Sequence, residues 1–221
     1  MPRPYLSFSS MVLFERSPEA WADYYIYHKK QRISRNMAYG SKMAEGLENE
    51  EASGDPLLDL MMAKLPKFEL KDKIVEDKEK GVEIKYEYDG KNYLIPFIES
   101  KLKGKKIKIP ILAKPDTAKP DYSAFKEYKT STRKWTQKMV DDSGQLTFYT
   151  TAIWLITKKI VKDIELINVP VEYLESFSVL QPTGQLVSFR TKRTMVDIIK
   201  MITRIKKAWT GMNQFCENEL W

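Results

Sequence analysis

Two periodicities of apolar residues alternate along the chain, and they restrict the folds that it can adopt. Apolar residues recur at helical spacing over the first 65 residues, alternate with polar residues from 83 to 112, and return to helical spacing near the C-terminus. A period of two is typical of a half-buried strand, and a period of 3.6 is typical of an amphipathic helix. The expected helices are 11–14, 17–28, 36–50, 57–65, 143–159 and 194–215, and the expected strands are 83–88, 91–97, 105–112, 125–129, 164–169 and 186–189.

The order of these elements indicates the fold class. Helices come first, a strand meander follows, and the chain then continues with a helix, two strands and a closing helix. Such a succession is typical of an α/β domain in which a central mixed β-sheet is flanked by helices. The 221 residues contain no internal repeat, low-complexity tract or convincing linker, so we expect one domain that spans residues 1–221.

Cysteine and histidine are almost absent, which excludes several kinds of site. The chain has one cysteine, Cys216, and one histidine, His28. A disulfide framework within the chain, a Cys-ligated zinc and an iron–sulfur cluster are therefore excluded, and the single histidine argues against a Ser–His hydrolase. Any bound metal must be held by oxygen ligands, which favours Mg²⁺, Mn²⁺ or Ca²⁺.

The sequence also lacks the features of a membrane or secreted protein. No apolar run approaches the ~20 residues of a membrane span, and the first residues lack the apolar core of a signal peptide. We therefore expect a cytoplasmic protein that has no membrane partner.

The net charge of +7 is distributed unevenly. Residues 45–89 contain 14 Asp and Glu against seven Lys, so the remaining residues carry a net charge of +14. Three segments are basic: 101–114 with six Lys, 126–138 with five Lys and Arg, and 190–207 with seven Lys and Arg. This excess favours an acidic partner such as nucleic acid or a membrane surface, while a charge that serves only solubility remains the alternative.

Two carboxylates and one ammonium group are spaced so that they can converge. Pro115-Asp116 follows the expected strand 105–112, and Glu127-Tyr128-Lys129 lies on the next expected strand. Side chains alternate along a strand, so Glu127 and Lys129 share a face. If the strand before Asp116 lies beside them, two carboxylates can hold Mg²⁺ and activate a water, and the Lys can stabilise a phosphate. The Glu-x-Lys tripeptide is common, and on its own it favours an ordinary exposed strand over a site.

The wider pattern resembles a known superfamily. Pro115-Asp116 followed by Glu127-Tyr128-Lys129 is similar to the motif of the PD-(D/E)XK nucleases. Gln145 and Tyr149, four residues apart on an expected helix, look like the Gln-x-x-x-Tyr motif of the RecB-type branch. Residues 39–45 resemble the glycine-led helix that carries a further acidic ligand in this branch. Residues 5–10 look like the opening of such a domain.

The resemblance implies a restriction-endonuclease-like core and a role for each matching residue. Asp116 and Glu127 would bind Mg²⁺ or Mn²⁺, Lys129 would be the catalytic lysine, and the carbonyl of Tyr128 and the carboxylate of Glu45 would be additional ligands. Gln145 and Tyr149 would contact substrate or brace the site. The basic segments, apart from the resemblance, supply three further candidates for substrate contact: Lys114, Lys134 and Trp135, whose ring can stack on an unpaired base or belong to the core.

The implied function is a metal-dependent deoxyribonuclease without an iron–sulfur cluster. We expect an exonuclease that acts on single-stranded DNA or duplex ends in replication, recombination, repair or phage DNA processing. The sequence contains no helicase motif, so a helicase or recombination protein would be a separate chain. Two alternatives remain open: a catalytically inactive module that binds nucleic acid or a partner on the same fold, and a structural protein whose charge is incidental.

Overall fold

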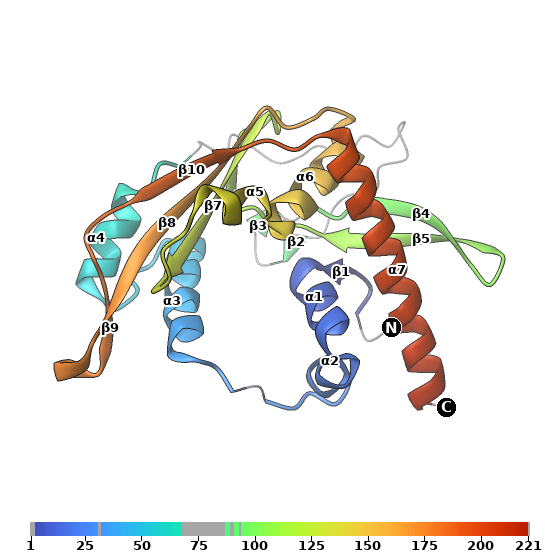
Figure 1. The fold of residues 1–221 in the computed structure, drawn as a ribbon, viewed down its shortest axis with the longest axis horizontal. Helices are drawn as coiled ribbons and strands as arrows, with labels where there is room; N and C mark the ends of the chain where they lie inside the picture. Colours follow the sequence, from blue (N-terminus) through green and yellow to red (C-terminus); the bar gives the residue numbers. More distant parts are fainter. Residues whose placement is uncertain (1–2, 31, 68–86, 89–90, 93, 221) are drawn as a thin grey trace.

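The computed structural model describes residues 3–30, 32–67, 87–88, 91–92 and 94–220 (Figure 1). Its elements in chain order are β1 Leu6–Ser7, α1 Phe8–Arg16, α2 Pro18–Tyr25, α3 Arg35–Asn49, α4 Pro56–Lys64, β2 Glu87–Tyr88, β3 Lys91–Asn92, β4 Phe97–Leu102, β5 Lys105–Leu112, β6 Thr117–Ala118, β7 Ala124–Ser131, α5 Gln137–Asp141, α6 Gly144–Thr157, β8 Asp163–Leu174, β9 Val179–Pro182, β10 Val187–Thr191 and α7 Met195–Leu220. The predicted α/β class is confirmed, since mixed sheets are flanked by helices.

Two mixed sheets take the place of the single central sheet that the sequence suggested. The larger sheet has the order β10-β8-β7-β6, and β9 also pairs with β8. Strands β7 and β8 are parallel, whereas β6, β9 and β10 run antiparallel to their partners. The smaller sheet has the order β1-β5-β4, in which β5 is parallel to β1 and antiparallel to β4. The expected strand 105–112 is β5, and it pairs with β1 and β4 instead of β7.

Several elements differ in extent from the expected ones. Helix α2 ends at Tyr25, and His28, expected to lie at its end, has a left-handed φ of 53°. Strand β8 is longer than the expected 164–169, because it continues to Leu174 and pairs with β9, which was not predicted. The expected hairpin is present as β2 paired with β3, while residues 83–86 and its turn at 89–90 lie outside the described residues.

The closing helix is long but amphipathic. Helix α7 has 26 residues, and it buries Ile198, Met201, Ile205 and Met212 against the rest of the protein. Its other faces carry lysines, arginines and acids. Among the described residues, no helix combines the length and the apolar character that crossing a membrane requires.

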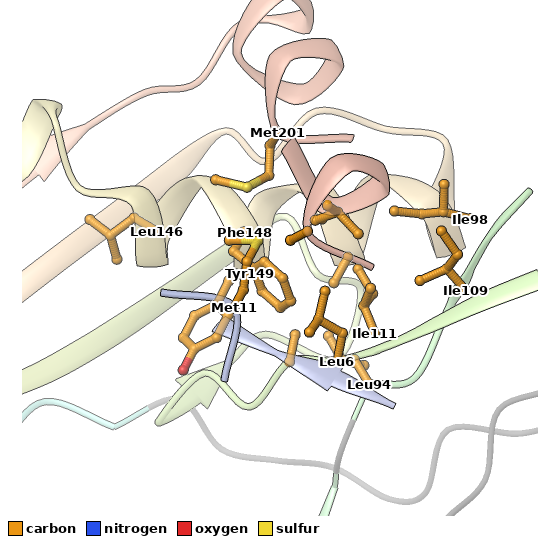
Figure 2. Packing of buried hydrophobic residues seen from close by; sticks show 14 of the residues in the cluster. Leu6, Met11, Leu94, Ile98, Ile109, Ile111, Leu146, Phe148, Tyr149 and Met201 are labelled. Atoms are coloured by element: carbon orange, nitrogen blue, oxygen red, sulfur yellow. The ribbon is translucent and has the colours of Figure 1, made fainter. Parts of the chain in front are cut away.

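Strand β7 separates two apolar clusters and is covered on both faces. The larger cluster joins the smaller sheet to α1, α6 and α7, and Figure 2 shows Leu6, Met11, Ile109, Ile111, Phe148 and Met201 within it. The smaller cluster joins α3 and α4 to the other face of the larger sheet. Phe125 belongs to the larger cluster and Tyr128 to the smaller one. Because side chains alternate along a strand, Glu127 and Lys129 face the side of α6.

A buried arginine anchors the start of α6. The guanidinium of Arg193 donates to the carbonyls of Val140 and Ser143, at 3.0 and 3.2 Å, and to the Thr147 hydroxyl at 2.7 Å. It also donates to the Thr191 hydroxyl at 2.7 Å. These bonds fix the loop from α5 to α6 against β10, and they thereby set where the first turn of α6 lies.

We expect Arg193→Met to destabilise the protein by roughly 2–4 kcal/mol, because it removes several buried hydrogen bonds that one charged group donates. The neighbouring Lys192 is exposed, so Lys192→Met is the matched control and should change stability by less than about 0.5 kcal/mol. Urea denaturation of both variants measures the difference. Equal effects would show that Arg193 does not anchor α6.

Candidate active site

Asp116 lies at the edge of the larger sheet, directly before β6. Strand β6 has two residues and pairs with the start of β7, where Thr117 is opposite Lys126. Beyond that point no described strand pairs with this edge of β7. The Asp116 carboxylate takes up the next position instead, and its Oδ2 accepts a hydrogen bond from the backbone N–H of Tyr128 at 2.6 Å. The short β6 thereby brings Asp116 next to Glu127.

Glu127 receives two donors on one of its oxygens. Its side chain is 2% exposed, and Oε1 accepts from Lys129 Nζ at 2.5 Å and from Gln145 Nε2 at 2.7 Å. Gln145 also donates to the Tyr149 hydroxyl at 2.8 Å, across one turn of α6. The structure therefore brings together five of the predicted residues: Asp116, Glu127, Lys129, Gln145 and Tyr149.

The other oxygen of Glu127 has no N–H or hydroxyl donor among the described residues. Oε2 is buried at the side of the site where Asp116 lies. The carboxyl groups of Glu127 and Asp116 are close enough for a hydrogen bond between them. Two carboxylates so close repel each other unless a proton or a cation lies between them. The pair fits a divalent cation such as Mg²⁺, which uses one or two protein carboxylates and completes its shell with water and phosphate oxygens.

The electrostatics of this pair favour protonation of Glu127. Burial raises the pKa of the Glu127 carboxyl to about 8, and repulsion from Asp116 adds to this while Lys129 opposes it. Burial of the Asp116 carboxyl also raises its pKa. The hydrogen bond from the Tyr128 N–H and the charge of Lys129 lower this pKa, but burial outweighs them. The Asp116 side chain remains exposed, so the proton of the pair lies on the buried Glu127.

Lys129 stays protonated beside these carboxyls. Burial lowers the pKa of its ammonium group, but attraction to Glu127 and Asp116 outweighs burial, and the net shift is upward. The side chain is 32% exposed, so the ammonium pairs with Glu127 and still has access to solvent. A cation in this place can meet a phosphate that enters from outside.

Tyr128 contributes its backbone to this edge. Its N–H points to Asp116, and the N–H and carbonyl of one strand residue point to the same side, so its carbonyl also faces the Asp116 edge. Its side chain points to the other face, where the hydroxyl donates to the carbonyl of Pro66 at 2.8 Å. The role of this carbonyl as a ligand stays a prediction.

Helix α3 approaches the site through a glycine, but it presents a different acid from the expected one. A Cβ at Gly40 would lie 3.3 Å from the Thr130 hydroxyl, so this glycine allows the helix to pack closely on β7. Glu45 is exposed, and the described residues contain no group of three acids or histidines placed to hold a metal. Glu48, three residues later, accepts from Lys114, whose charge reaches Asp116. The ligand role of Glu45 stays a prediction.

The loop after β7 carries the other two predicted contacts. Lys134 is exposed. Trp135 is half-buried, packs against the larger cluster, and lines an open hollow of about 400 Å³ together with Lys138 and Met139. One face of this indole serves the core, while the hollow leaves part of the ring accessible.

The basic segments lie at different places in the fold. Within 101–114, Lys114 adjoins the site, whereas Lys101, Lys106 and Lys108 lie on the hairpin formed by β4 and β5. Within 190–207, the Arg193 guanidinium is buried. Contiguity in sequence therefore did not predict which cations adjoin the carboxylates.

Sequence reasoning missed two polar residues near the site. Glu48 was overlooked although it lies one turn beyond Glu45, and helical spacing was the available signal. Asn168 lies opposite Lys129 in the parallel pairing of β7 and β8; it is 2% exposed, and none of the described residues donates to its Oδ1. The signal for Asn168 was a polar residue within an apolar strand.

Comparisons with known proteins give a distant likeness. No family model and no curated protein matches the chain. An alkaline exonuclease (LHK-Exo) from Laribacter hongkongensis has a TM-score of 0.40 and 10% identity, with 97% of this chain and 91% of that chain covered. The complex of LHK-Exo with dAMP has a TM-score of 0.40 and 9% identity, with 98% of this chain and 92% of that chain covered. A provisionally named exonuclease from Eubacterium rectale has a TM-score of 0.46 and 13% identity, with 98% of this chain and 82% of that chain covered. Likeness at this level does not assign an activity, so the function is inferred from the site's own residues.

The raised pKa of Glu127 predicts a pH-dependent stability. The pKa lies above the reference value of 4.5, so the contribution of the neutral carboxyl is complete below pH 4.5 and is lost as the pH rises through about 8. Glu127→Gln mimics the neutral group. In EDTA, we expect this variant to gain about 2–5 kcal/mol over the wild type between about pH 5 and pH 8 in denaturant unfolding.

Glu165 provides the matched control on the opposite face of the same sheet. Burial raises the pKa of its carboxyl, but the bonds from Lys126 and Ser188 outweigh burial and lower it overall. Glu165→Gln should therefore be less stable than the wild type at neutral pH, with a deficit that shrinks as the pH falls. Parallel pH trends in the two variants would contradict the assignment of the raised pKa.

Proposed function

We propose that the chain is a metal-dependent nuclease of the PD-(D/E)XK superfamily that hydrolyses phosphodiester bonds of DNA. The observation that carries this proposal is the pair of adjoining carboxyl groups, Asp116 and Glu127, in which no described residue donates to the buried Glu127 Oε2 and Lys129 lies alongside. Two carboxyl groups therefore lie side by side, and the ammonium group of Lys129 next to them retains access to solvent. This set of groups suits a phosphate substrate that arrives with a divalent cation.

The residues of the site divide the work of hydrolysis. A Mg²⁺ or Mn²⁺ ion held by Asp116, Glu127 and the carbonyl of Tyr128 would lower the pKa of a bound water and offset negative charge on the phosphate. Gln145 holds Oε1 of Glu127 and leaves Oε2 directed away from that bond. Lys129 orients the attacking water or stabilises the oxygens of the phosphate.

Asn168 gives Lys129 a second place to bind. When Glu127 is engaged by a cation, its attraction for the Lys129 ammonium weakens. The Asn168 amide, at the same register on β8, has an oxygen to which no residue of the described chain donates, and this oxygen can accept from Lys129. A buried amide of this kind costs stability unless it is paired, so its pairing in the working enzyme accounts for its presence.

We also propose a branch of the superfamily, a mode of cleavage and a class of partner. The Gln145–Tyr149 pair on α6 supports placement in the RecB-type branch. We further propose an exonuclease that acts on single-stranded DNA or duplex ends in replication, recombination, repair or phage DNA processing. A helicase or recombination protein would act with it as a separate chain. Cleavage of linear DNA without cleavage of a closed circle would establish the exonuclease mode.

Removing either central residue should abolish most of the activity. We expect Glu127→Gln and Lys129→Ala to lower kcat by about 10²–10⁴-fold, because each removes a group that acts on the transition state. The assay uses end-labelled single- and double-stranded DNA with Mg²⁺ or Mn²⁺, and EDTA should stop the reaction. Glu165→Gln serves as the control, because this carboxylate lies on the other face of the sheet and should leave kcat unchanged. Activity that survives both substitutions would overturn the site.

The contribution of α3 can be tested with a pair of acids one turn apart. Glu48 binds Lys114 beside Asp116, whereas Glu45 is exposed. We expect Glu48→Gln to lower kcat/KM by roughly tenfold or more and Glu45→Gln to change it by less than about threefold, since one strong hydrogen bond is worth roughly 1.5–3 kcal/mol. The reverse order would restore Glu45 as the ligand that the family resemblance implies.

A module that binds nucleic acid without cutting it is the second candidate. The observation that favours it is the absence of a three-acid group among the described residues. Wild-type protein that binds DNA but leaves it intact in Mg²⁺ and in Mn²⁺ would support this candidate over the nuclease.

A further inference from the structure

The hairpin of β4 and β5 is a fixed element rather than a loose loop. Lys103 and Gly104 join the two strands with φ angles of 49° and 78°, and two positive φ angles are typical of the tight type I′ turn. Lys103 also forms an ion pair with Glu217 of α7 at 2.7 Å. Figure 1 shows the hairpin reaching past α7, on the side away from β7.

An open hollow of about 500 Å³ lies between this hairpin and α7. Four lysines line it: Lys101, Lys106 and Lys108 from the hairpin and Lys206 from α7. Of the described residues that line the hollow, Glu99 is the single acid. Four ammonium groups with one carboxylate give the hollow a strong attraction for anions.

The arrangement of these lysines is unfavourable for the isolated protein. Lys101 lies directly opposite Lys106 in the antiparallel register of β4 and β5, and like charges in directly opposed positions destabilise a strand pair. Lys108 has Glu99 opposite it, but Lys101 and Lys106 have each other. Within the described part of the chain, no ion pair is recorded for Lys101, Lys106 or Lys206. An anion in the hollow would offset this repulsion.

The outward face of β5 leads from the hollow to the candidate active site. Odd-numbered residues of β5 such as Ile109 and Ile111 are buried, so the even-numbered positions face outward. That outward row contains Lys106 and Lys108, and it leads to Lys114, whose charge reaches Asp116. The eight residues of β5 span roughly 26 Å, which is about eight base pairs of duplex DNA.

We propose that the lysine hollow binds backbone phosphates of a DNA strand whose reacting end lies at Asp116 and Glu127. The proposal rests on the proposed nuclease function, and it adds a binding site for the part of the substrate that is not cut. Binding to phosphates reads no base, so the hollow would hold any sequence. A lipid surface is a poorer fit, because none of the exposed large apolar residues lies on this hairpin.

The test is a charge-matched pair of double variants. Lys101→Ala/Lys106→Ala removes the opposed lysines. Lys159→Ala/Lys162→Ala removes two exposed lysines near the start of β8, at the opposite end of β7 and β8 from Lys129. Binding to a duplex of about 30 base pairs is measured by fluorescence anisotropy in EDTA over a range of salt concentrations. We expect the hairpin variant to bind several-fold more weakly and its log–log salt slope to fall by about 2, as two lost phosphate contacts require, with little change in the control.

Stability separates a binding role from a structural one. Removing the opposed charges should leave the melting temperature unchanged or raise it, and Lys101→Arg/Lys106→Arg should restore affinity. Equal affinity and equal salt slope in the two alanine variants would overturn the proposal. A variant that loses both stability and affinity, without rescue by arginine, would also overturn it.

Cleavage gives an independent readout. The hairpin variant should lose kcat/KM on long duplexes and keep it on stems of about six base pairs, which are too short to reach the hollow from the site. Wild-type protein that cleaves nothing would refute the nuclease function, whereas the affinity and salt measurements would still decide whether the hollow binds DNA.

Discussion

The burial of the Glu127 carboxylate is the constraint on which the rest of the site depends. A buried ionised carboxyl is costly unless it is paired, so burial favours the protonated form of Glu127; Lys129 and Gln145 donate to Oε1, while no described residue donates to Oε2. The positions of Gln145 and Asp116 beside Glu127 each depend on a specific feature of the fold. Gln145 reaches Glu127 because the first turn of α6 is fixed against β10 by Arg193. Asp116 reaches it because β6 begins only at Thr117, which leaves the edge of β7 at Tyr128 to the Asp116 side chain.

Local patterns predicted the elements and the shared face of Glu127 and Lys129, because both depend only on the period of a strand or a helix. They did not predict which strands pair. The strand 105–112 is followed directly by Asp116, yet it pairs with β1, which lies about a hundred residues earlier in the chain, and with β4. Its buried isoleucines fit the larger cluster, and no local signal contains that information. The sequence predicted that the strand before Asp116 lies beside β7 and brings Asp116 to Glu127. The strand that pairs with β7 is instead β6, which follows Asp116.

The choice between Glu45 and Glu48 shows the same limit on a helix. Sequence places both acids on α3, but the side that meets β7 is fixed by the close approach of Gly40 to Thr130. At about 100° per residue, Glu48 lies roughly 80° around the helix from Gly40, whereas Glu45 lies roughly 140° away. Glu48 is therefore nearer the sheet, in agreement with its contact to Lys114. The glycine alone indicated a close contact, but the partner of that contact was needed to choose the acid.

Three features of the structure are locally unfavourable: the unpartnered oxygens of Glu127 and Asn168, and the opposed pair Lys101 and Lys106. Proteins tend to keep such features where they serve a function. Lys129 binds one oxygen of Glu127, but no described group donates to the other oxygen, and Lys101 and Lys106 face each other without an acid between them. A divalent cation alone would satisfy only the first, and a small anion would satisfy only the second. A phosphodiester chain that carries a divalent cation supplies both, and the outward face of β5 joins the two places along one line. The opposite signs of the two deficits are therefore better explained by one extended ligand than by two separate ones.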